Sequence, residues 1–381
     1  MSFILTEEQE ELLALVRKFS EKEILPYAHQ MDVEAHFVPG LIQKIADLGF
    51  MGINVPEEYG GVGADEVTKA LVIMEFAKYD ASVAELLAVH TLSSDIILKH
   101  GTPEQKEKYL TKACTGAVGA FALTEPNAGS DAAAAKTKAI SQGDEYIING
   151  SKCFISNMGQ DEGDYVILIV LTDPEKKTKG MSAIIVDRDT PGFTVPKTED
   201  KMGLRAAPVS ELYFDECHVP KSQLLGEEGK GFAIAMAGLD GGRIGMASQA
   251  VGLAESCIAE SVEYSTQRVQ FGKPVNANQG LQWYLADMAT KTEAAKALTL
   301  NAAALRQAGK NITKEAAMAK YYASETAVEV ANKALQIHGG YGYMKEYAIE
   351  RQYRDARIIP IYEGTSEVQK MVISSAVING K

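Results

Sequence analysis

The chain has 381 residues, of which 46% are hydrophobic and 23% are charged, and its formal net charge at pH 7 is -13. This length is too great for one ordinary hydrophobic core and predicts two or three domains, while the composition excludes a disordered chain. The acidic balance, without any basic stripe, argues against nucleic acid as a partner.

The first third of the sequence predicts a helical domain over residues 1–116. Thr6 and Gln9 have the spacing of a capping box, and Thr102 can cap a helix with Pro103 in its first turn. Other helices are expected over residues 40–48, 65–79 and 81–100. No run of about 20 uninterrupted apolar residues occurs, which predicts no membrane insertion. The acidic start is unlike a signal or transit peptide, so we expect a cytoplasmic protein.

Near Ala117 the hydrophobic pattern changes from helical to extended, which predicts an all-β domain over residues 117–228. Short runs rich in Ile, Val, Tyr and Phe are separated here by Gly, Pro, Asn and Asp. The strands are expected over residues 117–124, 145–149, 152–156, 165–171, 181–186, 193–195 and 211–214.

Residues 229–381 return to a helical pattern. Helices are expected over residues 232–268, 277–308 and 314–338, with a short one from Ser366. The fold class is therefore α+β, with several domains in the order helical, β, helical. The four cysteines are widely spaced, so we expect buried thiols and no metal site; they are Cys114, Cys153, Cys217 and Cys257.

A turn near the end of the chain carries a single carboxylate, Glu363. Residues 358–361, Ile-Ile-Pro-Ile, lead into it from a charged segment. Gly364 permits tight backbone geometry, and Thr365 can cap the helix that follows. Seen alone, Glu363 is either a solvated acid stabilised by the helix dipole or a catalytic base in an apolar site. The residues of this segment leave both interpretations open.

Arg-Asp-Ala-Arg at residues 354–357, followed by Ile-Tyr-Glu-Gly-Thr-Ser-Glu at residues 361–367, resembles the C-terminal signature of the acyl-CoA dehydrogenase family. The similarity extends from about Leu5 to the last residues and favours the short-chain, butyryl-CoA dehydrogenase-like branch. It implies a middle β-barrel or sandwich and a C-terminal four-helix bundle.

The resemblance also implies an activity. An FAD-dependent enzyme of this family converts an acyl-CoA to an enoyl-CoA, with Glu363 taking the α-proton and the flavin taking the β-hydride. The backbone N–H of Glu363 is implied as a donor to the thioester carbonyl. The electrons are then expected to pass to an electron-transfer flavoprotein.

Two strand motifs are similar to those that hold the flavin ring in the family. Leu-Thr-Glu-Pro-Asn-Ala-Gly-Ser-Asp at residues 123–131 implies flavin contacts and a contact with the CoA side. Phe-Ile-Ser-Asn at residues 154–157 resembles Trp-Ile-Thr-Asn, and an aromatic ring and a hydroxyl are retained in it. The implied flavin contacts are Phe121, Leu123, Thr124, Phe154 and Ser156, and Ser130 is implied on the CoA side.

Two further segments, at residues 268–272 and 336–340, resemble those that bind the adenosine diphosphate half of FAD across a subunit interface. Physically, Arg268 supplies a charged fork for pyrophosphate, and Gly339 with Gly340 permits close backbone approach. The resemblance therefore implies a homotetramer. The remaining implied cofactor residues are Gln270, Phe271, Gln336, Thr365 and Glu367.

The substrate is expected to contact three parts of the chain. Asp240 and Arg243 begin a stretch that meets CoA in the family, and Tyr362 and Gly364 flank the catalytic turn. Some branches of the family carry their base at the position of Gly242, but glycine cannot serve, so Glu363 has no rival among the family's placements.

The helix over residues 81–100 should line the acyl chamber. Glu85, Ala88, Val89 and Leu92 share one of its faces, which places Glu85 nearer the chamber than Asp95. These two carboxylates either reach solvent or a neighbouring cation, or one of them enters the chamber. In the second case an alicyclic acyl group would meet a second acid or base.

Four alternatives remain open. One is an enoyl-CoA reductase that runs the same chemistry backwards in an anaerobe, and another is a dehydrogenase of the cyclohexanecarboxyl-CoA type. An oxidase that uses oxygen is the third, and the fourth, from a different class, is a non-catalytic acyl-CoA-binding protein. A hydrolase is disfavoured because the sequence has no Gly-x-Ser-x-Gly elbow.

Overall fold

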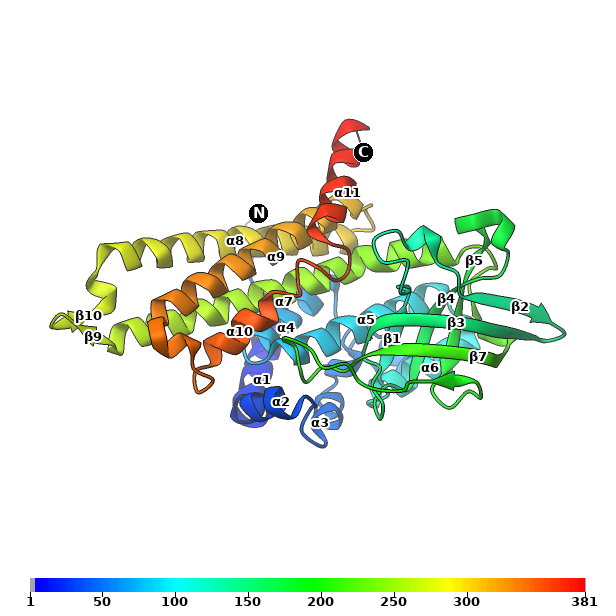
Figure 1. The fold of residues 1–381 in the computed structure, drawn as a ribbon, viewed down its shortest axis with the longest axis horizontal. Coiled ribbons are helices and arrows are strands. Elements are labelled where there is room, and N and C mark those ends of the chain that lie inside the picture. The colour runs from blue at the N-terminus through cyan, green and yellow to red at the C-terminus, as the bar shows by residue number, and fades with distance from the viewer. Residues whose placement is uncertain (1–3, 381) are drawn as a thin grey trace.

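The computed structural model describes residues 4–380 and places a β-sheet at one end of an elongated molecule, with long helices running towards the other end (Figure 1). Residues 1–3 and Lys381, at the ends of two predicted domains, lie outside the described residues. The helices are α1 (Glu7–Glu23), α2 (Ala28–Glu34), α3 (Leu41–Asp47), α4 (Glu66–Ala77), α5 (Ala81–His100), α6 (Pro103–Cys114), α7 (Gly231–Gln267), α8 (Gln279–Gln307), α9 (Thr313–His338), α10 (Ala348–Ala356) and α11 (Ser366–Ile378).

The sheet contains eight strands in the order β6-β7-β3-β2-β4-β5-β8, with β1 paired to β4. The β1–β4 pairing is parallel, so the sheet is mixed. The predicted fold class, helical, β, helical, is confirmed. The strands of the sheet are β1 (Gly119–Ala122), β2 (Lys138–Gln142), β3 (Glu145–Ser156), β4 (Tyr165–Leu171), β5 (Met181–Asp187), β6 (Phe193–Thr194), β7 (Val209–Pro220) and β8 (Leu224–Leu225), and β9 (Val269–Gln270) pairs with β10 (Lys273–Pro274) as a separate hairpin.

The sequence correctly marks several helix starts. Thr6 and Gln9 form the capping box of α1, and Thr102 caps α6 with Pro103 in its first turn. Helix α5 begins at Ala81, as expected. By length and composition α5 is able to cross a membrane, but 89% of that window is buried inside the protein, as in the core helix of a globular domain.

The sequence analysis was wrong where it divided β3 into two strands, 145–149 and 152–156. The two runs form one strand, because bulges between Ile148 and Gly150 and between Lys152 and Ile155 keep it paired with β7. Gly150 has φ +146° and packs so closely on Thr137 that a Cβ would lie 2.7 Å from Oγ1. A glycine that signals a break in the sequence is here a bulge position.

Helices α2 and α10 and strand β2 were not predicted, nor were the two-residue strands β8, β9 and β10. Helix α10 is polar and charged, and ion pairs stabilise it: Arg354 Nε lies 2.8 Å from Glu350 Oε2 one turn earlier. Arg354 also forms a two-pronged contact with Asp32 of α2, at 2.9 and 2.7 Å. The sequence of α10 alone does not reveal such a long-range pair.

Helix α10 joins the three parts of the molecule. Arg354 binds Asp32 of the N-terminal part, and Asp355 accepts a hydrogen bond of 2.6 Å from the backbone N–H of Leu204, in the loop before β7. Asp355 is buried, and burial together with nearby Asp80 raises its pKa to about 7. The chain that leaves α10 towards Glu363 therefore starts from a fixed point.

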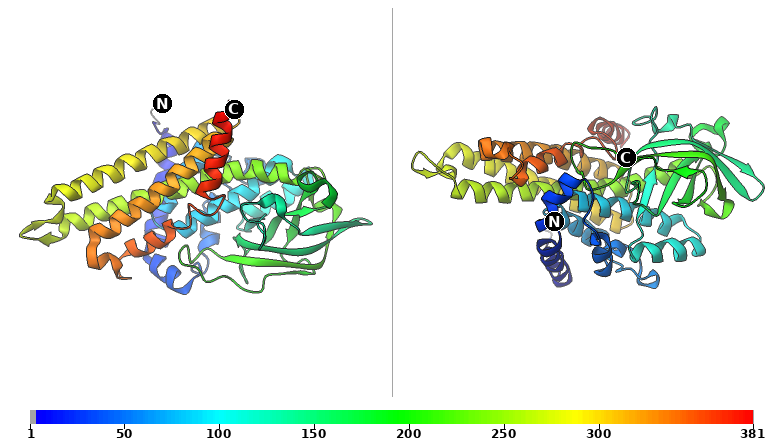
Figure 2. Two further views of the ribbon diagram at one scale, coloured as in Figure 1. Left: turned by 45° about the horizontal axis from the view of Figure 1, so that its top comes forward. Right: turned by 60° about the horizontal axis from the view of Figure 1, so that its bottom comes forward.

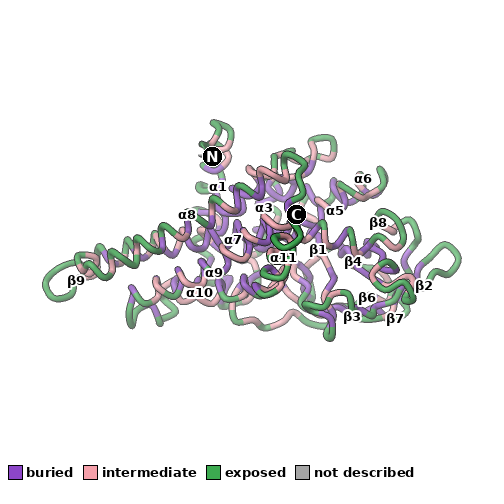
Figure 3. Tube along the Cα trace, turned by 90° about the horizontal axis from the view of Figure 1, so that it is seen from above, coloured by how far each residue is buried: buried purple, intermediate pink, exposed green. Residues whose placement is uncertain are grey.

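Helices α5 and α7 cross in the centre of the molecule, where the chain is most buried (Figure 3). A Cβ on Gly245 of α7 would lie 3.1 Å from Cβ of Ala88 on α5. The missing side chain lets the two backbones approach, and both helices thus face the turn that carries Glu363.

Candidate active site

The turn around Glu363 has an uncommon backbone conformation. Glu363 has φ +53° and Gly364 has φ +92°, so two consecutive residues are left-handed. For Glu363 this conformation costs about 1 kcal/mol. Glycine is favoured at position 364 by this φ, and a Cβ there would also lie 2.6 Å from Nε2 of Gln369. Thr365 caps α11 by accepting from the Val368 N–H at 3.3 Å, as its position predicts.

The Glu363 carboxylate occupies space left by a missing side chain. A Cβ on Gly242 of α7 would lie 2.8 Å from Glu363 Oε2 and 3.4 Å from Cδ2 of Leu92 on α5. Within residues 4–380, Oε2 is buried and has no hydrogen-bond partner. Burial raises the pKa of Glu363 to about 7, although Arg243 and Lys320 act to lower it. Such a carboxylate can accept a proton near neutral pH.

Asp240 and Arg243 lie together on α7. Arg243 Nη1 donates to Asp240 Oδ1 at 2.6 Å, and the Thr313 hydroxyl donates to the other oxygen at 2.6 Å. Only 6% of Arg243 is exposed, and its Nε has no partner among the described residues. The guanidinium therefore acts on Glu363 from inside the protein.

Of the two carboxylates on α5, Glu85 lies on the side of the site and Asp95 is bound elsewhere. Glu85 is 2% exposed and accepts a hydrogen bond of 2.7 Å from the hydroxyl of Ser156. Burial raises the pKa of Glu85 to about 7; Ser156 and Lys201 act against this shift, and Glu363 adds to it. Asp95 instead pairs with Lys69 at 2.7 Å and Arg306 at 2.9 Å.

Tyr362, beside Glu363, is also held in the buried site. Its hydroxyl donates to Gln249 Oε1 of α7. Burial raises the pKa of Tyr362 well above its ordinary value, and Glu85 and Glu363 raise it further. The two carboxylates and this phenol therefore form one electrostatic group.

The strand end predicted to contact the flavin is fixed by a buried ion pair. Lys152 of β3 is fully buried and donates to Glu125 Oε1 at 2.8 Å and to the Leu123 carbonyl at 3.0 Å. The Cys153 N–H donates to the Thr124 carbonyl at 3.0 Å. The pair was not predicted, and its signal in the sequence is a lysine directly before the apolar run Cys-Phe-Ile at residues 153–155. Leu123 and Thr124 are thereby locked beside β3.

Other implied contacts of the flavin segment lie at the surface. Phe154 has φ +58°, sits at the second bulge of β3 and is 73% exposed. Ser130 is exposed beyond the end of β1, and Phe121 is partly buried. An exposed aromatic ring and an open strand end fit a flat cofactor laid along this edge.

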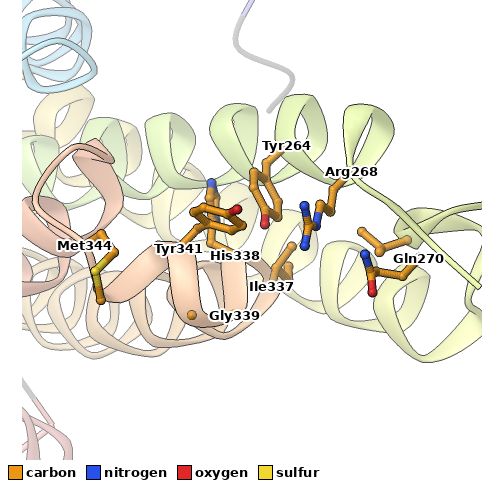
Figure 4. A pocket seen from close by; sticks show the side chains of 10 residues that line it. Tyr264, Arg268, Gln270, Ile337, His338, Gly339, Tyr341 and Met344 are labelled. Carbon is orange, nitrogen blue, oxygen red and sulfur yellow. The ribbon is translucent and has the colours of Figure 1, made fainter.

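A pocket of about 510 Å³ lies where the end of α7 meets the end of α9 (Figure 4). Arg268 points towards it and lies 5.1 Å from the ring of Tyr341. Gly339 and Gly340 are open, since a Cβ at either would meet nothing within 4 Å. A guanidinium beside bare backbone fits a phosphate group. The pocket is lined by Tyr264, Arg268, Gln270, Val275, Ile337, His338, Gly339, Gly340, Tyr341 and Met344.

Besides Thr365, three implied cofactor residues of the C-terminal domain lie outside this pocket. Phe271, in the β9–β10 turn, is 98% exposed, and Gln336 is exposed on α9. Glu367 is exposed in the first turn of α11, where backbone N–H groups and the Thr365 hydroxyl lower its pKa.

The chain separates the two groups of implied FAD residues. The β9–β10 hairpin and the end of α9 lie at one end of the molecule, and the sheet lies at the other (Figures 1 and 2). The residues of both groups fit parts of FAD, but one chain does not bring the two groups together.

Sequence reasoning also missed two residues that contact the catalytic turn. Lys320 Nζ of α9 donates to the Gly364 carbonyl at 2.7 Å, and Gln369 Nε2 of α11 donates to the same oxygen at 2.9 Å. A lysine among the alanines of a core helix is a signal that could have revealed Lys320.

Comparison with known families agrees with this geometry. Three family models match, namely the N-terminal domain of acyl-CoA dehydrogenase at residues 6–117, the middle domain at residues 120–217 and the C-terminal domain at residues 229–378.

Individual proteins match over almost the whole chain. An acryloyl-CoA reductase (NADH) from Anaerotignum propionicum is 53% identical, and the match covers 99% of this chain and 96% of that protein. Butyryl-CoA dehydrogenase from Megasphaera elsdenii is 46% identical with a TM-score of 0.96, over 99% of this chain and 100% of that one. A chain from work on the electron transferring flavoprotein of Acidaminococcus fermentans is also 46% identical, with a TM-score of 0.97 and the same coverage.

The fold, the buried carboxylate and these matches agree with the resemblance found in the sequence. The chain belongs to the acyl-CoA dehydrogenase family of FAD-dependent oxidoreductases, which act on the CH–CH bond of an acyl-CoA.

Proposed function

We propose that Glu363 is the base that removes the α-proton of a short-chain acyl-CoA. One observation carries this proposal: Glu363 Oε2 is buried, lacks a partner within the described residues and lies against the gap at Gly242. A carboxylate whose pKa is about 7 is well matched to proton abstraction at neutral pH.

The surrounding residues prepare the proton transfer. The Glu363 backbone N–H donates to no acceptor within residues 4–380, so it is available to the thioester carbonyl. Asp240, Arg243 and Ser130 remain the proposed contacts of the CoA moiety. Tyr362 and Gly364 fix the turn from either side. FAD supplies the two-electron acceptor for the hydride that leaves the β-carbon.

The acyl group is proposed to be short. Leu92 and Glu363 both lie within 3.4 Å of the position that a Cβ on Gly242 would take, and buried Glu85 puts a polar group on the same side of α5. A long alkyl chain would have to displace or bury this carboxyl group at a cost. The butyryl-CoA dehydrogenase relative supports this class. An alicyclic acyl group that uses Glu85 as a second acid or base is the competing substrate class.

The reverse direction is the second candidate function. The acryloyl-CoA reductase relative, at 53% identity, favours reduction of a short enoyl-CoA. By microscopic reversibility Glu363 would then return its proton to the α-carbon, with no change in the residues of the site.

Assembly, partner and domain limits are proposed together. The separation of the two FAD segments supports a homotetramer in which one subunit completes the cofactor site of its neighbour. The relative from the electron transferring flavoprotein work supports such a flavoprotein as electron partner. The proposed domains are residues 1–116, 117–228 and 229–381. The proposed location is the cytoplasm.

The test is anaerobic bleaching of the purified, FAD-loaded protein by butyryl-CoA and then by cyclohexanecarboxyl-CoA. Wild-type protein should bleach with butyryl-CoA, and Glu363→Gln should bind FAD and acyl-CoA but bleach at least about 10³-fold more slowly. Glu107→Gln, an exposed position on α6, is the matched control.

Other outcomes decide between the alternatives. Bleaching by the cyclic thioester alone would assign the alicyclic class, and normal bleaching by Glu363→Gln would exclude Glu363 as base. The reductase direction would be favoured if acryloyl-CoA reoxidises the reduced flavin faster than the saturated thioester bleaches the oxidised flavin. Rapid reoxidation by oxygen would identify an oxidase, and a protein that cannot take up FAD would be non-catalytic.

A further inference from the structure

Lys320 is a lysine that helix α9 buries completely. Its exposed fraction is 0%, and Ala316, Ala323 and Ala327 on the same helix are also buried. Burying an ammonium group costs several kcal/mol unless opposite charge and hydrogen bonds compensate it. A lysine in this place therefore needs a partner.

The hydrogen bond of Lys320 is made to the catalytic turn. Within the described residues, the single acceptor of Nζ is the carbonyl of Gly364, at 2.7 Å. The bond crosses from α9 to the left-handed pair formed by Glu363 and Gly364. It thus fixes the peptide group that directly follows the base.

The charges around Lys320 come from three other segments and from α9 itself. Glu363 faces it from the turn, Arg243 from α7, Glu367 from α11 and Glu325 from its own helix. Glu325 accepts a hydrogen bond of 2.5 Å from Ser366, and Glu367 is exposed. Glu363 differs from these two carboxylates. Its Oε2 is buried and has no hydrogen-bond partner within residues 4–380.

The influence between the two groups is mutual. Burial lowers the pKa of Lys320 to about 8, and Glu363 is the strongest influence in the opposite direction. Lys320 is therefore still mostly protonated at pH 7. Its charge lowers the pKa of Glu363 in turn. Arg243 lowers it more strongly than Lys320 does, although Asp240 at 2.6 Å offsets part of the Arg243 charge.

We propose that Lys320 is a positioning residue for the base, because its ammonium group holds the Gly364 carbonyl and, together with Arg243, supplies positive charge that favours the ionised form of Glu363. This inference rests on the proposed role of Glu363. It assigns two tasks to one side chain, namely the geometry of the turn and the charge state of the carboxylate.

The test measures the rate of flavin bleaching by butyryl-CoA against pH, in anaerobic single turnover of FAD-loaded protein. The acid limb of this profile follows the ionisation of Glu363, since only the carboxylate accepts a proton. Lys320→Met removes the charge and the hydrogen bond, so the midpoint of the limb should move up by about one pH unit or more. Lys320→Gln retains a donor but no charge, and the same upward shift is expected.

Two controls separate charge from packing. Gln369→Leu removes the other donor to the turn without changing charge, so it should slow bleaching and leave the midpoint in place. Lys333→Met removes a lysine about 20 Å further along α9 that pairs with Glu329 and Asp287. This variant should change neither the bleaching rate nor the midpoint of the acid limb.

An unchanged midpoint in a folded, FAD-loaded Lys320→Met or Lys320→Gln protein would overturn the proposal. If Lys320→Met does not fold, Lys320→Gln decides the question alone. Failure of the proposed function is distinguishable, because wild-type protein would then not bleach with butyryl-CoA at any pH.

Discussion

Helix α5 buries two carboxylates, Glu85 and Asp95, in opposite surroundings. Asp95 binds Lys69 at 2.7 Å, Arg306 at 2.9 Å and the amide of Asn54 at 2.5 Å. Burial alone would raise the pKa of Asp95, but the two cations bring it below its ordinary value. Asp95 is ionised throughout the neutral range and is a structural group.

Glu85 is 2% exposed, less than the Asp95 side chain at 13%, and has far less compensation. The Ser156 hydroxyl, at 2.7 Å, is its hydrogen-bond donor, and Lys201 acts on it without a contact as close as an ion pair among the described residues. Burial therefore raises the pKa of Glu85 to about 7. The comparison shows that placement of cations, more than burial, separates a structural carboxylate from one that can titrate in a reactive site.

Removal of the Asp95 charge should have the largest effect. Asp95→Asn leaves Lys69 and Arg306 with Glu66 as their remaining acidic neighbour, so we expect a loss of about 3–5 kcal/mol in the free energy of unfolding. The loss should be constant from pH 5 to pH 9, because Asp95 is ionised over this range in the folded and unfolded states. Urea unfolding of the FAD-loaded protein measures it.

A compensating variant provides the control for Asp95. Asp95→Asn combined with Lys69→Met leaves Glu66 with Arg306, which restores the charge balance, so part of the lost stability should return. If the free-energy costs of Asp95→Asn and Lys69→Met simply add in the double variant, the two charges are independent. That result would contradict the comparison.

Neutralisation of Glu85 should have a smaller and opposite effect. The folded-state pKa of about 7 lies above the ordinary 4.5, so the wild-type protein loses stability as pH rises from about 4.5 to 7. Glu85→Gln removes this loss. Its free energy of unfolding should exceed that of the wild type by up to about 3 kcal/mol at pH 8 and by almost nothing at pH 4.

The same urea series at pH 4, 6 and 8 measures the effect of Glu85→Gln. The charged or titratable groups that face Glu85 are Lys201, Glu363 and Tyr362, and all three are kept in this variant. A gain that does not vary with pH would show that packing, and not the charge of Glu85, is responsible.

Local sequence patterns predicted the parts of the site that lie within one segment. The helix expected over residues 81–100 has the limits of α5, Ala81–His100. The turn at Glu363 is marked by Gly364 and by the cap at Thr365. The placement of Glu85 and Leu92 on one face of α5 follows from helical periodicity. In each case neighbours within a few residues determine the geometry.

The missing parts depend on contacts between distant segments. Lys320 reaches Gly364 across 44 positions, and Arg306 reaches Asp95 across 211. No periodic pattern predicts which lysine or arginine meets which carboxylate, so the sequence placed Glu85 nearer the chamber but did not show that Asp95 is the one with cationic partners. The left-handed φ of Glu363 is also beyond sequence patterns, because non-glycine residues adopt it rarely.

The smallest expected effect concerns the single hydroxyl that binds Glu85. Ser156→Ala removes a donor at 2.7 Å, and the loss should be larger for the ionised carboxylate than for the neutral acid. We therefore expect it to cost about 1 kcal/mol more at pH 8 than at pH 5, in urea unfolding of the FAD-loaded protein. Ser94→Ala on α5 is the control, because its hydroxyl donates to the His90 carbonyl, which does not titrate, and its cost should be the same at both pH values. Equal costs for Ser156→Ala at pH 5 and pH 8 would mean that Glu85 keeps one charge state over this range, which would contradict a pKa of about 7 and the difference from Asp95.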